Sequence, residues 1–116
     1  MDKNYYITTP IYYPSAKPHM GHAYSSIIAD FFARFKRMDG YNVHFLTGTD
    51  EHGLKIQRSA ENKKLDPLKF CNEISQTFRN LSETLNLSNT DFIRTTEERH
   101  KKTVQHLWSQ LEKNDN

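Results

Sequence analysis

Hydrophobic and polar positions divide the first half of the chain into a strand, a helix and a second strand. Residues 5–9 are a short apolar and β-branched run closed by Pro10, which predicts a buried strand. From Ala23 onward, apolar residues recur with helical spacing as far as Met38, and Gly40 is a suitable stop. Residues 41–47 alternate and predict a second strand that ends at Gly48. This order predicts a βαβ unit with parallel strands and a right-handed crossover.

The first predicted helix has one apolar face, which we expect to be buried. Its polar residues Asp30, Arg34 and Arg37 fall off that face. The apolar face consists of Ala23, Ile27, Ile28, Phe31, Phe35 and Met38.

The second half of the chain predicts three helices and one short strand. Residues 54–62 are a short helix, and Asp66 followed by Pro67 is a strong start signal for the next one. That helix should reach about Asn86, with an apolar seam of Cys71, Ile74, Phe78, Leu81 and Leu85.

The last predicted elements are a short strand at 91–94 and a helix behind it. Thr95 and Glu98 have the spacing of a capping box at the start of this helix. Its apolar residues, which we expect to point inward, are Val104, Leu107, Trp108 and Leu111.

Composition indicates a folded domain or a piece of one. The chain has 116 residues, of which 35% are hydrophobic, and 16 basic residues nearly balance 14 acidic ones. Mean hydropathy is low at −0.85, yet seven Phe, six Tyr and one Trp provide bulk for a core. The charge balance gives no nucleic-acid footprint, so we expect no DNA partner. The basic residues of 55–69 are spread along helical sequence and are interpreted as a solvated face.

The single cysteine and the lack of long apolar segments narrow the class further. Cys71 alone cannot form an internal disulfide or a cysteine-based zinc site, and its place on an apolar stripe predicts a buried side chain. No signal peptide or membrane-spanning segment is apparent, so we expect a cytoplasmic protein without membrane contact.

The predicted elements form half of a known kind of sheet. One βαβ unit followed by helices, with no returning strand after the polar stretch 112–116, is half of a doubly wound sheet. We therefore expect an α/β fold, the first half of a Rossmann-like doubly wound parallel sheet with flanking helices, and interpret residues 1–116 as a fragment. Its open edge and uncovered apolar surface predict self-association or marginal stability.

The connection at 10–22 carries the strongest chemical signal. Its three prolines exclude a helix interior or a central strand, so it is a stiff link that delivers His19 and His22 to the start of a helix. A helix amino end attracts anions, and two imidazoles beside it suit a polyphosphate. Gly21, which has no Cβ, allows a ligand to approach the backbone. The plainer alternative is a pair of solvated histidines.

A second polar connection, residues 47–53, follows the second predicted strand. Ligands of open α/β sheets bind beyond the carboxyl ends of the strands, so both connections should face one crevice. Thr49, Asp50, Glu51 and His52 would supply a carboxylate pair and another imidazole to it. His19, His22, Asp50 and His52 could also bind zinc or iron. The position at a helix start favours a phosphate site and no metal.

Several of these segments together resemble one enzyme family. His19-Met20-Gly21-His22 resembles the His-φ-Gly-His ("HIGH") signature of class I aminoacyl-tRNA synthetases. With 9–14, 18–24, 29–30 and Gly48-Thr49-Asp50-Glu51-His52-Gly53, the chain resembles methionyl-tRNA synthetases. The similarity continues through 85–88, 92–97, His100 and Trp108, and covers about residues 4–113.

The resemblance implies an activity and a set of site residues. The family activates methionine with MgATP to methionyl-adenylate and transfers it to tRNA(Met). By resemblance, His19 and His22 are catalytic and bind the triphosphate of ATP together with Pro10 and Gly21. Methionine would be held by Ile11, Tyr13 and Asp50, with His52 beside the pocket. Asp50 would pair with the α-ammonium group.

The chain also departs from the family pattern. The Lys-Met-Ser-Lys-Ser loop, the connective insertion and the anticodon-binding domain have no counterpart here, and any zinc would belong to that insertion. We therefore expect residues 1–116 to be the N-terminal part of the catalytic domain and to be inactive alone. The alternatives are another nucleotidyltransferase with a His-x-Gly-His phosphate site, or a truncated product without catalysis.

Overall fold

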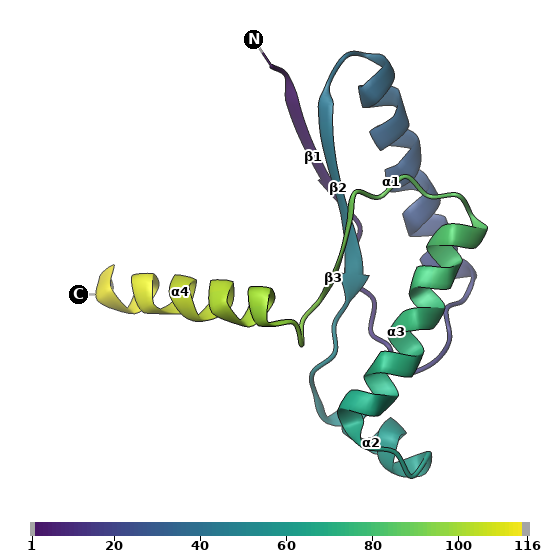
Figure 1. The fold of residues 1–116 in the computed structure, drawn as a ribbon, viewed down its shortest axis with the longest axis vertical. Helices are drawn as coiled ribbons and strands as arrows, with labels where there is room; N and C mark the ends of the chain where they lie inside the picture. The colour runs from purple at the N-terminus through teal and green to yellow at the C-terminus, as the bar shows by residue number, and fades with distance from the viewer. Residues whose placement is uncertain (1, 115–116) are drawn as a thin grey trace.

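A small parallel sheet organises the fold. The computed structural model describes residues 2–114, and Figure 1 shows their arrangement. The sheet has the order β1-β2-β3 with both pairs parallel, which confirms the α/β fold expected from the sequence. The elements are β1 (Asn4–Thr8), α1 (Met20–Met38), β2 (Asn42–Thr49), α2 (Leu54–Asn62), α3 (Pro67–Thr84), β3 (Asp91–Arg94) and α4 (Glu98–Asn114).

One face of the sheet carries the core. Val43 and Phe45 of β2 are buried against α1, and Phe92 of β3 is buried against residues of α2 and α3. Because Thr47 pairs in register with Phe92, these side chains share one face, so α1 and α3 lie on the same side (Figure 1). The opposite face holds Tyr6, which is 61% exposed.

The first strand is less buried than predicted. β1 pairs only with β2 among the described residues, and its side chains are half-buried or exposed. The sequence pattern reports apolar character, whereas burial depends on a second neighbouring strand, and β1 is an edge strand of this three-stranded sheet.

The second strand runs through the residue expected to end it. β2 continues to Thr49, and Gly48 pairs with Ile93 of β3. A Cβ atom built on Gly48 would lie 2.0 Å from the carbonyl oxygen of Ile93. Gly48 therefore permits close approach of the two strands and does not end β2.

The buried face of α1 differs from the one predicted. Its buried residues are small or polar, namely Ser26, Ala29, Asp30 and Ala33. Small side chains let the helix approach the sheet closely, while the predicted apolar face turns away from it. The large hydrophobic residues on the exposed side include Ile27, Ile28, Phe31, Phe35 and Met38.

Asp30 is buried because it has several hydrogen-bond donors around it. Its carboxylate accepts hydrogen bonds from the backbone N–H and the hydroxyl of Ser88, and from Arg34 at 2.7 Å. Arg37 donates to Ser88 as well. These bonds fasten α1 to the segment that leads into β3.

The positions of α2 and α3 agree with those predicted from local sequence patterns. The bounds of α2 are as predicted, and α3 begins at Pro67 and ends at Thr84, close to the expected Asn86. The Asp66 carboxylate accepts hydrogen bonds from the N–H groups of Leu68 and Lys69, as an N-cap should. The predicted seam is confirmed at Cys71, Ile74 and Phe78, which are buried. Burial raises the pKa of the Cys71 thiol to about 11.

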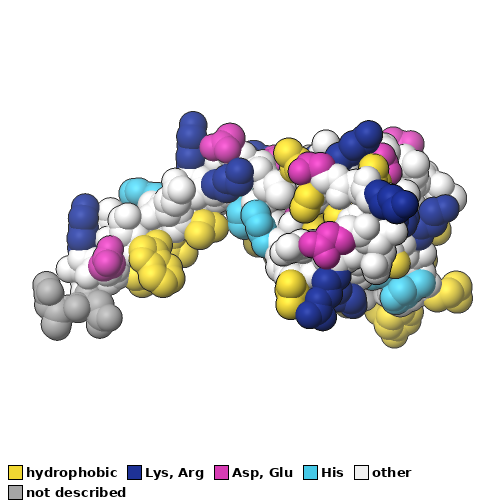
Figure 2. All heavy atoms as spheres, turned by 90° about the horizontal axis from the view of Figure 1, so that it is seen from below, with side chains coloured by type: hydrophobic (Ala, Val, Ile, Leu, Met, Phe, Trp, Pro, Cys, Tyr) yellow, Lys and Arg dark blue, Asp and Glu magenta, His cyan; other side chains and the backbone are white. Residues whose placement is uncertain are grey.

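Helix α4 projects away from the rest of the chain (Figure 1). None of its residues is buried, so the inward orientation predicted for Val104, Leu107, Trp108 and Leu111 is wrong within residues 2–114. Figure 2 shows hydrophobic side chains along the surface of this helix. Together with the exposed apolar residues of α1, they form uncovered apolar surface of the kind from which self-association was predicted. Among residues 2–114, no helix combines the length and apolar character needed to cross a membrane.

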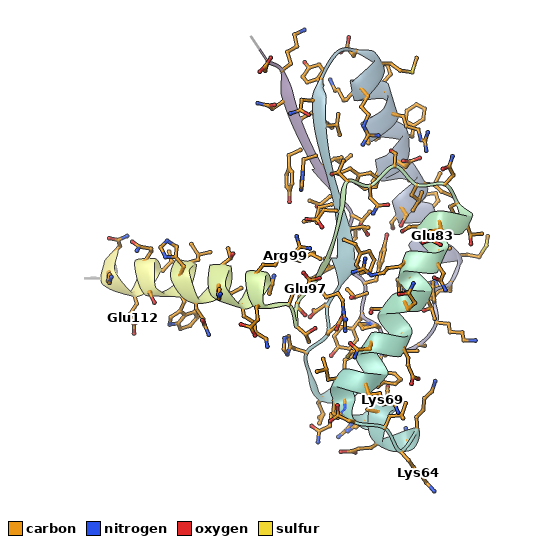
Figure 3. All side chains as sticks on the ribbon, in the orientation of Figure 1. Lys64, Lys69, Glu83, Glu97, Arg99 and Glu112 are labelled. Carbon is orange, nitrogen blue, oxygen red and sulfur yellow. The ribbon has the colours of Figure 1, made fainter. Side chains whose placement is uncertain are left out.

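The start of α4 also differs from the prediction. The hydroxyl of Thr95 accepts a hydrogen bond from the N–H of Glu51 at 2.8 Å, in place of the expected box with Glu98. Arg99 pairs with Asp91 and Glu97, and Figure 3 shows Arg99 and Glu97 together at the base of the helix. The junction is held by contacts to β2 and β3 that a local sequence pattern does not reveal.

Candidate functional site

The first connection is fixed to the end of β2 by its own backbone. Tyr12 forms an isolated parallel bridge with Thr49: its N–H donates to the oxygen of Gly48 and its oxygen accepts from the N–H of Asp50, each at 2.9 Å. The hydroxyls of Thr9 and Thr47 lie 2.7 Å apart. The prediction that the two connections meet at one edge of the sheet is therefore confirmed.

Two histidines form a reciprocal cap on the amino end of α1. His19 is the N-cap residue, and its Nδ1 accepts a hydrogen bond from the N–H of Gly21 at 3.0 Å. His22 lies at the third helical position, and its Nδ1 accepts from the N–H of His19 at 3.0 Å. The rings stack with their centroids 3.9 Å apart. The helix begins at Met20, three residues before the predicted start, because His19 supplies a cap that propensity rules assign to other residue types.

This cap determines which nitrogen carries the proton. Since Nδ1 accepts a hydrogen bond in both rings, the proton of each neutral imidazole is on Nε2. His19 is exposed and His22 is half-buried. Burial lowers the pKa of His22, and the neighbouring His19 lowers it further. With Nδ1 occupied in each ring, the pair presents two Nε2–H donors beside the positive end of the α1 dipole.

We expect the imidazole of His22 to titrate below its ordinary pKa of 6.5. Because the folded pKa lies below the unfolded one, the stability contributed by neutral His22 is fully present above pH 6.5 and is lost as the pH falls through the folded pKa. Nitrogen-15 NMR of the ring would show the Nε2–H tautomer at pH 7.5 and a depressed midpoint. The same titration in urea is the control, and a folded midpoint at or above the urea value would contradict the expectation.

The side chain of Tyr13 joins the two connections, and that of His52 reaches Thr95, just before the start of α4. The Tyr13 hydroxyl donates to the carbonyl oxygen of His52 at 2.7 Å, and His52 Nε2 lies 3.2 Å from the carbonyl oxygen of Thr95. Gly53 follows with φ of 117°, a conformation that residues with a Cβ rarely adopt. The half-buried Tyr13 ring therefore bridges the site from 10–22 to 47–53.

Replacing Gly53 with alanine is expected to lower the free energy of unfolding by about 1–3 kcal/mol. The new Cβ would lie 2.3 Å from the Tyr13 hydroxyl oxygen in addition to the unfavourable φ. Urea unfolding measures the loss. Gly40→Ala is the matched control, because Gly40 also has a positive φ of 84° but has nothing within 4 Å of the new Cβ. Equal losses in the two variants would show that the clash with Tyr13 contributes nothing.

The two adjacent carboxylates of the second connection have different roles. Glu51 is buried and accepts hydrogen bonds from two nitrogens of Arg94, both at 2.7 Å, and from the hydroxyls of Thr49 and Thr96. Within residues 2–114, the half-buried Asp50 carboxylate has no hydrogen bond or ion pair. The predicted carboxylate pair is therefore wrong: Glu51 fastens β2 to β3, and only Asp50 is free to bind a cation.

The remaining predicted residues lie on the same connections. Pro10 and Ile11 are exposed on the first connection, with Ile11 at 39%. His52 lines a cavity of about 240 Å³ together with Thr95 and residues of α4. The backbone N–H of Gly21 is already bonded to His19, so this group is not open to a ligand. In the described part of the chain, no group of three or more His, Cys, Asp or Glu side chains is arranged to hold a metal ion.

Comparison with known proteins places this geometry in a family. The family model described as "tRNA synthetases class I (M)" matches residues 5–116. The chain belongs to the class I tRNA synthetases of the methionine type. It is 58% identical over 110 residues to the mitochondrial methionine–tRNA ligase of Takifugu rubripes and 56% identical over 111 residues to that of Rickettsia bellii.

A solved structure supports the fold of this synthetase chain. Methionyl-tRNA synthetase of Mycobacterium tuberculosis, in complex with methionyl-adenylate, matches with a TM-score of 0.91 and 48% identity. The match covers 92% of this chain and 21% of that protein. The matches to the Takifugu and Rickettsia relatives cover 95% and 96% of this chain but only 19% and 22% of those proteins. It therefore spans about a fifth of the proteins it matches.

Sequence reasoning missed the residues that support the site from behind. Tyr12 and Phe78 pack against the His22 ring, Ser26 forms a hydrogen bond with Tyr12, and Arg94 neutralises Glu51. Only Phe78 was indicated by the sequence, because it lies on the apolar seam predicted for α3. The contacts of the other three join positions 10 or more residues apart, and no local sequence pattern predicts such contacts.

Proposed function

We propose that the chain forms the part of a methionyl-tRNA synthetase active site that binds ATP and the methionine ammonium group. In the proposed reaction, a carboxylate oxygen of methionine attacks the α-phosphorus of ATP, and the bond to pyrophosphate breaks to give methionyl-adenylate. The terminal hydroxyl of tRNA(Met) then attacks the methionyl carbonyl and AMP leaves. Residues 1–116 would be the N-terminal part of the catalytic domain.

The observation that carries this proposal is the histidine cap with a free carboxylate nearby in the fold. The substrate is its own nucleophile, so the protein has to position two reactants and stabilise charge. The Nε2–H groups of His19 and His22 and the amino end of α1 suit the phosphates of ATP, which carry Mg²⁺ as part of the substrate. The unpaired carboxylate of Asp50 suits the ammonium group of methionine.

The other proposed contacts follow from position. Ile11 and the Tyr13 ring would line the methionine side-chain pocket, since a thioether favours apolar and aromatic neighbours. His52 would border that pocket through its hydrogen bond with Tyr13. Pro10 and Gly21 would lie against ATP.

The wider assignments also belong to this proposal. Transfer RNA and any zinc would be bound by other parts of a full-length synthetase, which residues 1–116 do not include. We propose a cytoplasmic location without membrane or DNA partners, supported by relatives from bacteria such as Rickettsia bellii. The mitochondrial name of the Takifugu relative makes import into mitochondria the alternative, and fractionation of cells that express the protein would distinguish them.

Methionine-dependent exchange of pyrophosphate with ATP tests the proposal. We expect residues 1–116 alone to show no exchange above background, because the Lys-Met-Ser-Lys-Ser loop is absent from them. A chimera in which these residues replace the matched 22% of the Rickettsia bellii ligase should be active. Asp50→Asn in that chimera should raise the KM for methionine by about tenfold or more, because a charged hydrogen bond is lost.

Each outcome assigns the chain differently. A folded chimera that exchanges no pyrophosphate and binds neither ATP nor methionine would favour a chain without catalytic function. Normal exchange by residues 1–116 alone would overturn the expectation that they are incomplete. The alternative of a different nucleotidyltransferase is answered by the family match over residues 5–116.

A further inference from the structure

Tyr12 contacts both halves of the site although it is itself only 7% exposed. Its backbone lies in the first connection and bonds to Gly48 and Asp50, next to the carboxylate proposed to bind methionine. Its side chain points away from Asp50, toward His22 in the first turn of α1. Tyr13 also joins the two connections, through its hydroxyl, but it is more exposed and does not reach His22 by any hydrogen bond or ring contact among residues 2–114.

The side chain of Tyr12 fixes the position of His22. Its hydroxyl lies 2.8 Å from the Ser26 hydroxyl and donates to the carbonyl oxygen of His22 at 3.2 Å. The two rings meet edge to face with centroids 4.8 Å apart. Phe78 of α3 stacks on Tyr12 at 5.7 Å and meets the His22 ring edge to face at 5.0 Å. Two aromatic rings therefore confine the imidazole while its Nδ1 is held by the cap.

We propose that Tyr12 is a positioning residue that fixes the His22 imidazole relative to Asp50. Its backbone holds the Asp50 end and its ring and hydroxyl hold the His22 end, so one residue sets the separation of the phosphate and ammonium sites. Its burial leaves it little surface for a substrate, which distinguishes it from the neighbouring Tyr13. The effect on the reaction rests on the proposed function, whereas the effect on His22 does not.

The test uses the intact protein as its gene encodes it, with Tyr12→Phe as the main variant. This change removes the hydroxyl and keeps the ring. We expect kcat of pyrophosphate exchange to fall by about tenfold, with the KM values for ATP and methionine within about twofold of the wild type, because a shifted imidazole acts on the transition state more than on binding. Adding Ser26→Ala should cause no further fall, since its hydroxyl acts through Tyr12. Tyr6→Phe, at an exposed tyrosine on β1, is the matched control.

A second measurement separates positioning from simple stability. In Tyr12→Phe the NMR resonances of the His22 ring should shift, while those of His44 on β2 should not. A variant with a lower melting temperature but wild-type kcat and wild-type His22 resonances would overturn the proposal. If the wild-type protein showed no exchange at all, the proposed function would fail, and the His22 resonances would still decide whether Tyr12 holds that ring.

Discussion

Replacing Arg94 with methionine is expected to lower the free energy of unfolding by about 3–5 kcal/mol at neutral pH. The Glu51 side chain is fully buried, and Arg94, which is 19% exposed, is the cation that pairs with it. Methionine fills similar volume but leaves a buried carboxylate without its counter-charge. The hydroxyls of Thr49 and Thr96 remain as donors, but they carry no charge. Urea unfolding at pH 7 measures the loss.

The pH dependence of this loss identifies its cause. Burial alone would raise the pKa of Glu51, but hydrogen bonds from Arg94, Thr49 and Thr96 outweigh burial and hold the pKa below its ordinary value of 4.5. In the wild type, this stabilisation is present above pH 4.5 and is lost as the pH falls through the folded pKa. Without Arg94 the pKa of Glu51 should rise above the unfolded value. The variant then loses stability as the pH rises, so its deficit should narrow toward about pH 4.

Arg99→Met is the matched control for Arg94→Met. Arg99 forms ion pairs with Asp91 and Glu97, but its side chain is 49% exposed at the base of α4 (Figure 3). Water screens exposed ion pairs, so this variant should lose only a small part of what Arg94→Met loses. Similar losses at both positions, or a deficit at Arg94 that stays constant from pH 7 to about pH 4, would contradict a buried-charge explanation.

The elements that the sequence placed correctly are those with local signals. Asp66 and Pro67 mark the start of α3 through hydrogen bonds that reach only two and three residues ahead. The bounds of α2 and β3 also follow from short patterns. Such features depend on residues close together in the sequence, so a short stretch of sequence is enough to predict them.

The faces of helices α1 and α4 were not predictable in the same way. Periodicity shows that α1 has an apolar stripe, but Ala29 and Ala33 pack on the sheet and Phe31 and Phe35 do not. Which face is buried depends on what lies opposite it in space. For α4, nothing within residues 2–114 covers the apolar face at all.

The meeting of the two connections was predictable, but the hydrogen bonds and ion pairs within and behind them were not. The strand-end rule brought 10–22 and 47–53 together, and the structure confirms their contact through Tyr12 and Tyr13. The partner of Glu51 is Arg94, 43 residues away, and no spacing rule links them. The cap formed by His19 and His22 was also missed, because capping rules are built on shorter polar side chains.

Replacing His19 with asparagine is expected to lower pyrophosphate exchange by about 10²–10³-fold in the intact protein while leaving the helix start intact. Asparagine is among the best N-cap residues, so its side-chain oxygen can take the place of Nδ1 as acceptor for the Gly21 N–H. The group that is lost is Nε2–H, which we propose as a hydrogen-bond donor to the phosphates of ATP. Steady-state exchange kinetics and thermal unfolding together measure the two effects.

The contrast between stability and rate makes the His19 variant informative. His44→Asn is the control, because His44 lies on the open face of the sheet and stacks on Tyr6, away from α1. It should change neither the exchange rate nor its dependence on ATP. If His19→Asn kept full activity, the histidines would act only as caps, and the amino end of α1 would have to bind phosphate without them. If the variant lost stability as well as activity, the expectation that asparagine can replace His19 as the N-cap would be wrong. A loss of rate alone would assign the distal nitrogen of His19 to the reaction and its proximal nitrogen to the fold.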